Sequence, residues 1–117
     1  MATNYIGSGT FVANSAITAF RNVVISNNRG VGLSATAGSV DGVALIDAAS
    51  GDYISVAFLT NNGTLNGTLI GAPVTIGDTL FAGASGQLST TGTVTIGKAL
   101  TTAATDGSVI EWIPKNL

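Results

Sequence analysis

Short apolar runs, several of them alternating with polar residues, recur along the chain and are separated by Gly and Asn at intervals of about eight to twelve residues. The runs are rich in Val, Ile and Thr, which favour the pleated surface of a β-strand. No segment keeps a helical period long enough to predict a helix. We therefore expect strands over residues 20–26, 30–35, 42–46, 52–59, 78–83, 86–90, 93–100 and 108–113.

Two of the loops between these strands carry turn residues. The sequence SNNRG, residues 26–30, predicts a turn because Asn and Gly tolerate a positive φ. The sequence AGASGQ, residues 82–87, predicts the loop of a hairpin that joins Leu80 and Phe81 to Leu88. The second loop is short, so it is expected to connect neighbouring antiparallel strands.

One strand–connector–strand sequence is written twice. The segment GVALIDAASGDYISVAF covers residues 42–58, and GKALTTAATDGSVIEWI covers residues 97–113. Both contain Gly, Ala, Leu and a pair of Ala at the same spacing, followed by a turn and a β-like run. The small Ala side chains allow the connector to lie close to the sheet. This duplication predicts two related β units that together build the core.

The register of the final strands in the two copies depends on the turn before them. Inserting one residue in the second turn aligns Ile54 with Ile110. The same insertion aligns Val56 with Trp112 and keeps apolar positions on one face, whereas a slip of one residue would exchange the two faces. With this register and the strands above, the predicted core residues are Ile54, Val56, Phe58, Leu80, Leu100, Ile110 and Trp112.

The pattern as a whole predicts an all-β fold: a single domain over residues 1–117, forming a compact small barrel or sandwich with little or no helix. Residues 1–19 have two interpretations, an ordinary first strand or an N-terminal arm that orders against a partner. Residues 60–73, TNNGTLNGTLIGAP, contain two Asn-Gly turn signals and Pro73, and they predict a flexible loop between the two halves.

The composition narrows the chemistry. The chain has no Cys and no His, which leaves no disulfide, no thiolate metal site and no histidine general base. Its four Lys and Arg residues are dispersed, so we expect no nucleic acid as a partner. No run of about 18 apolar residues exists, so we expect no membrane partner, and the first residues do not have the pattern of a secretion signal.

The acidic residues are best interpreted as turn residues. Most of the six stand beside Gly, as in Asp41-Gly42 and Asp106-Gly107. No calcium-loop or phosphate-loop spacing is present, and no Ser or Thr has a His partner. We therefore expect no enzymatic activity and no cofactor. Trp112, the only Trp, has two interpretations, a binding platform or a core residue, and its alternation with Ile110 favours the core.

The order of several segments resembles a known family. These segments are NYI near the start, VVI followed by GVGLSA, DGVALIDAASGDYISVAF, and IGDTLFAGASGQLSTTGTVTIGKALTTAATDGSVIEWIP. They resemble the small capsid decoration, or cement, proteins of tailed bacteriophages over nearly the whole chain. The most specific parts are GDTLFAGASGQLS, IGKAL and DGSVIEWIP, whereas residues 60–73 depart from the family pattern.

This resemblance implies a structural role. Such proteins are made in the host cytoplasm, bind the outer surface of the capsid in the virion, commonly form homotrimers, and clamp neighbouring subunits of the major capsid protein. The family has no catalytic residues. The low charge, 9% of residues, suits a chain whose surface meets other protein. With an N-terminal arm that orders on docking, the expected capsid contacts are Thr3, Asn4, Tyr5, Ile6, Thr10 and Phe11.

A carbohydrate- or surface-binding β module of a phage structural protein is the alternative hypothesis. The Thr-, Asn- and Gly-rich loops favour it. Sugar sites usually combine aromatic side chains with acids and amides, and the sequence predicts few exposed aromatic residues. The alternative therefore ranks second.

Overall fold

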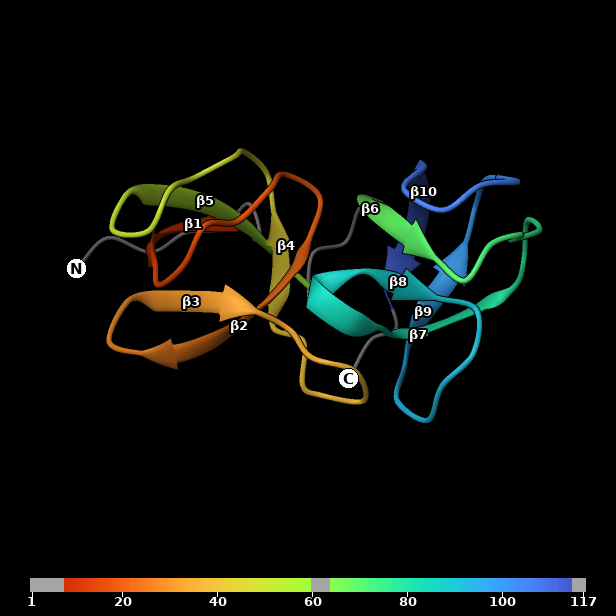
Figure 1. Cartoon of the computed structure of the whole chain (residues 1–117), viewed down its shortest axis with the longest axis horizontal. Helices are drawn as coiled ribbons and strands as arrows, with labels where there is room; N and C mark the ends of the chain where they lie inside the picture. The colour runs from red at the N-terminus through yellow and green to blue at the C-terminus, as the bar shows by residue number, and fades with distance from the viewer. Residues whose placement is uncertain (1–7, 60–63, 115–117) are drawn as a thin grey trace.

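The computed structural model describes residues 8–59 and 64–114, and within these ranges ten strands form two closed barrels of five strands each (Figure 1). One 3-10 turn, η1, covers Ala84–Gly86. The first barrel contains β1 (Ser8–Ala13), β2 (Asn22–Asn27), β3 (Gly30–Leu33), β4 (Gly42–Ala44) and β5 (Tyr53–Phe58). The second barrel contains β6 (Leu65–Ile70), β7 (Thr79–Ala82), β8 (Leu88–Ser89), β9 (Thr95–Ala99) and β10 (Val109–Pro114).

The two barrels have the same strand connections. In the first, β1 pairs in parallel with β3 and antiparallel with β5, and β2 lies between β3 and β4. In the second, β6 pairs in parallel with β8 and antiparallel with β10, and β7 lies between β8 and β9. The all-β prediction with two related units is confirmed. The repeat is larger than the sequence indicated, because each unit closes into a barrel of its own.

The register predicted for the repeated strands is also confirmed. Ala44 of β4 lies opposite Val56 of β5, and Ala99 of β9 lies opposite Trp112 of β10. Val56 and Trp112 therefore occupy equivalent positions. Equivalence is used below in this sense: two residues that hold the same place in the strand pairing of the two barrels.

Each barrel has its own apolar interior. The first is small, and its buried residues are Phe11, Ala13, Ile17, Val23, Val31, Ala44, Ile54 and Val56. The second has larger side chains and includes Leu65, Leu69, Val74, Leu80, Leu88, Ile96, Ile110 and Trp112. Of the predicted core residues, Ile54, Val56, Leu80, Ile110 and Trp112 are buried, whereas Phe58 and Leu100 are only half-buried.

The prediction of a flexible loop over residues 60–73 is wrong for its central part. Leu65–Ile70 form β6, and residues 60–63 lie outside the described residues. The Asn66-Gly67 pair, interpreted as a turn signal, stands inside this strand. A Cβ atom on Gly67 would lie 2.3 Å from Leu88 Cδ1. This glycine is therefore needed for close packing, not for a turn.

The N-terminal arm is likewise corrected where the structure describes it. Ser8–Ala13 form β1, the ordinary first strand of the alternative interpretation. The ring of Phe11 is only 6% exposed and meets Phe58 edge to face, with the ring centroids 5.8 Å apart. Residues 1–7 lie outside the described residues.

The second barrel covers one outer face of the first. Val43 and Ala57, which point outward from β4 and β5, are 0% and 3% exposed because they join the apolar cluster of the second barrel. Three backbone hydrogen bonds cross the interface: Thr68 N–H donates to Phe20 O at 3.0 Å, Gly86 N–H donates to Ser34 O at 2.7 Å, and Ala37 N–H donates to Ala82 O at 3.2 Å. The barrels thus pack in tandem along the 41 Å length of the molecule (Figure 1).

Candidate functional site

The carboxylates serve to hold loops in place. Glu111 accepts a hydrogen bond from the Thr64 hydroxyl at 2.6 Å. The other five accept backbone N–H groups: Asp41 from Ile25, Asp47 from Ala19, Asp52 from Ala49, Asp78 from Thr75 and Asp106 from Ala72. Within residues 8–59 and 64–114, no three acidic side chains come together in a group that could hold a metal ion. The hydrogen bonds that these carboxylates accept are a structural role that explains their positions.

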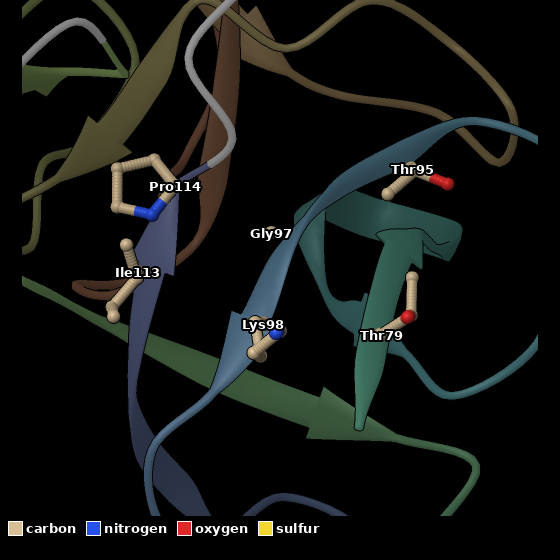
Figure 2. Close-up of a pocket in the computed structure, with 6 residues that line it drawn as sticks. All are labelled: Thr79, Thr95, Gly97, Lys98, Ile113 and Pro114. Carbon is tan, nitrogen blue, oxygen red and sulfur yellow. The ribbon is translucent and has the colours of Figure 1, made fainter. Parts of the chain in front are cut away.

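A shallow hollow of about 360 Å³ lies on the outside of the second barrel (Figure 2). Its lining comes from β7, β9 and β10, and the residues are Thr79, Thr95, Gly97, Lys98, Ile113 and Pro114. We call this surface the open face. Ile113 is 45% exposed there, and Lys98 stands opposite it on the neighbouring strand. The open face therefore combines exposed apolar surface with one ammonium group.

Alternation along β10 produces this exposure. Ile110 and Trp112 point into the barrel and are buried, so Glu111 and Ile113 point outward. Lys98 alternates in the same way with Gly97 and Ala99, which are buried. The alternation in the sequence SVIEWIP indicates that Ile113 points outward. The hollow that Ile113 lines depends on how β7, β9 and β10 meet, which the sequence does not show.

The open face has a covered counterpart in the first barrel. Lys98 pairs with Ile113 as Val43 pairs with Ala57. Thr79 next to Lys98 likewise corresponds to Asn22 next to Val43. In the first barrel this face is buried beneath the second barrel, whereas in the second barrel the same face is open.

Of the residues expected to contact a capsid, the structure describes Thr10 and Phe11, which lie on β1 and do not line the open face. Thr3, Asn4, Tyr5 and Ile6 fall outside the described residues. Thr10 is exposed on β1, and its carbonyl accepts a hydrogen bond from the Arg29 guanidinium, which also lies 4.7 Å from the centre of the Phe11 ring. Phe11 is a core residue, so its side chain is not available for a contact from the folded barrel.

Aromatic side chains contribute little to the described surface. Trp112 is fully buried, which rejects the binding-platform interpretation and confirms the core one. Tyr53, at the start of β5, is the exception and is 76% exposed. In the part of the chain that the structure describes, no helix has the length and apolarity needed to span a membrane.

Comparison with known proteins identifies the fold. No protein-family model matches the chain. No curated protein matches it in sequence. Among solved structures, the chain is similar to the N-terminal base of the head fiber protein gp8.5 of bacteriophage phi29, with a TM-score of 0.78 and 23% sequence identity over 93% of both chains. At this identity the likeness establishes a shared fold over nearly the full length.

Proposed function

We propose that this chain is a structural protein of a bacteriophage head that binds the outer surface of the capsid and stabilises the shell. The observation that carries the proposal is the similarity over 93% of both chains to the base of a phage head fiber. The sequence resemblance to capsid decoration proteins supports the same role independently. The carboxylates, each engaged in a hydrogen bond, offer no competing catalytic arrangement among the described residues.

The mechanism follows from linkage. A protein that binds the assembled shell more tightly than its dissociated subunits stabilises the shell by mass action. Copies joined to each other, as in the homotrimer that the family resemblance implies, bind several subunits of the major capsid protein at once and gain avidity. Clamping neighbouring subunits in this way requires a rigid body, which two barrels joined by a buried apolar interface provide.

The test uses heads of the phage that encodes the chain, prepared without it, and purified labelled protein. We expect saturable co-sedimentation at a fixed ratio to the major capsid protein, and a higher temperature of DNA release from the decorated heads. Heads of an unrelated phage are the control. Absence of co-sedimentation, or equal binding to the unrelated heads, would reject the proposal.

A surface-binding β module remains the second candidate because Tyr53, an aromatic residue, is 76% exposed. Sugar sites pair an aromatic ring with a concave pocket and polar side chains. The hollow described above is lined by none of the aromatic residues. A glycan array would support this candidate if binding disappeared with Tyr53→Ala.

A further inference from the structure

We propose that the open face of the second barrel binds a second copy of this chain, and that the surface it binds is the β2–β3 hairpin side of that copy's first barrel. The proposal rests on the part of the proposed function in which copies of the chain associate with each other, and not on binding to the capsid. It derives from the internal repeat: the chain already contains one such contact between its own two barrels.

The contact between the two barrels of one chain shows which surface packs on the covered face, the β2–β4–β5 side of the first barrel. In the second barrel, the β7–β8 hairpin and β6 approach the first barrel: η1 lies against β2, and β6 lies against β4 (Figure 1). A Cβ atom on Gly86 would lie 2.5 Å from Asn22 O, so the hairpin tip meets β2 at backbone distance. The Arg21 guanidinium also donates to Ser85 O at 3.0 Å. The interface thus joins the β2–β4–β5 side of one barrel to the hairpin side of the next.

The first barrel carries the equivalent hairpin side, and it is exposed. Strand pairing places Val12 at the position of Thr68, and Ile25 at the position of Ala82. Ala82 is buried at 2% and its carbonyl accepts the Ala37 N–H at 3.2 Å. Ile25 is 46% exposed. We call the surface formed by Val12, Ile25 and Arg29 the hairpin surface.

The two surfaces lie at opposite ends of the tandem. The β2–β3 and β7–β8 hairpins point in the same direction in Figure 1, the second toward the first barrel and the first away from the rest of the molecule. One copy therefore presents an open face at one end and a hairpin surface at the other. Such a head-to-tail contact is heterologous, and identical copies joined by it form a closed ring when the rotation between them closes.

The side chains at the two surfaces are compatible with this contact. Ile113 on the open face and Ile25 on the hairpin surface are exposed to similar extents, 45% and 46%, and burying them together would remove apolar area from water. The charges at the two surfaces, Lys98 and Arg29, have the same sign. The Arg29 guanidinium is held on its own barrel by the Thr10 carbonyl and the Phe11 ring. Ile25 is therefore the side chain of the hairpin surface that we expect to contact the open face.

The absence of Cys from the chain permits a direct test. Three variants each carry one thiol at a site of matched exposure: Ile25→Cys, Ile113→Cys and the control Ile46→Cys, whose native side chain is 48% exposed on the β4–β5 connector. Purified chains, one isotopically labelled, are mixed in pairs without phage heads. They are treated with a short bismaleimide, and the linked peptides are identified by mass spectrometry.

We expect the Ile25→Cys and Ile113→Cys pair to form linked dimers at least about tenfold faster than any mixture with Ile46→Cys, because a specific contact raises the effective concentration of the two thiols. Light scattering should also show that Ile113→Arg lowers the average mass of the protein. No excess over the control, or a predominant link between two Ile113→Cys chains, overturns the proposal. Because heads are absent, a negative result leaves binding to heads to be judged by co-sedimentation alone.

Discussion

The indole of Trp112 lies on the backbone of Gly97, so close that a Cβ atom on Gly97 would come within 2.5 Å of Trp112 Cε3. The first barrel repeats the relationship: a Cβ atom on Gly42 would lie 2.6 Å from Val56 Cγ1. These are the glycines that begin the two copies of the repeated sequence. Each lets its own strand, β4 or β9, pass directly beneath a core side chain of the neighbouring strand.

Replacing Gly97 by Ala should therefore destabilise the fold. The added methyl group meets the buried indole and the Ile113 carbonyl, and overpacking of this kind costs about 1–3 kcal/mol. Urea denaturation followed by circular dichroism measures the change. Gly32→Ala is the matched control, because no atom lies within 4 Å of its Cβ position. Equal losses of stability in the two variants would contradict the close-contact explanation.

Removing the indole should have a larger effect. Trp112 is 0% exposed and fills the centre of the second barrel. Trp112→Ala leaves a cavity, and such large-to-small changes cost about 3–5 kcal/mol. Thermal unfolding by circular dichroism is the suitable measurement, since the variant lacks the only Trp. Tyr53→Ala, at a 76% exposed position, should change stability by less than about 0.5 kcal/mol.

The Asp106 carboxylate should contribute through one hydrogen bond. It accepts the Ala72 N–H at 2.7 Å across 34 residues of sequence, and so fastens the β6–β7 connector to the turn before β10. Asp106→Ala removes the acceptor and should lower the free energy of unfolding by about 1–2 kcal/mol. Asp106→Asn keeps an acceptor oxygen and should recover part of the loss. If Asp106→Asn is as destabilised as Asp106→Ala, the hydrogen bond is not the cause.

The repeated sequence could be read because its residues are fixed by backbone contacts. Gly42 and Gly97 lie beneath core side chains. The Ala residues recur for a related reason: Ala48 bridges to Ile17, and Ala103 bridges to Val74, at corresponding places in the two barrels. Both copies have small residues at all these positions, and this shared pattern is what makes the repeat recognisable in the sequence.

The first strand of each unit could not be matched in the same way, because the two barrels place their large side chains differently. Strand pairing makes Phe11 equivalent to Gly67. Phe11 fills the first barrel, where the β5 residue is Val56. In the second barrel Trp112 and Leu88 fill that space, so only Gly is accommodated on β6. The large side chain is thus on β1 in the first barrel and on β10 in the second. As a result β1 and β6 share no sequence pattern, and the sequence of β6 predicted a loop.

The exposure of the open face could not be predicted from the sequence for a different reason. Alternation predicts that Ile113 points outward, but an outward position is buried or exposed according to which barrel covers it. Val43 and Lys98 occupy equivalent outward positions, and only the packing of the second barrel on the first distinguishes them. The relevant contact joins segments far apart in sequence and leaves no local pattern.

Exchanging the residues at these two positions gives the last prediction. Val43→Lys places an ammonium group in the apolar contact between the barrels, where an unpaired charge costs more than about 3 kcal/mol. Lys98→Val puts the residue of the covered face onto the open one. Because Lys98 is exposed, this change should alter the free energy of unfolding by less than about 0.5 kcal/mol. It should also increase the average mass measured by light scattering, since it removes a charge that a docking copy must desolvate. A stable Val43→Lys variant would show that the barrels do not depend on this contact, and an unchanged mass for Lys98→Val would count against the open face as a binding surface.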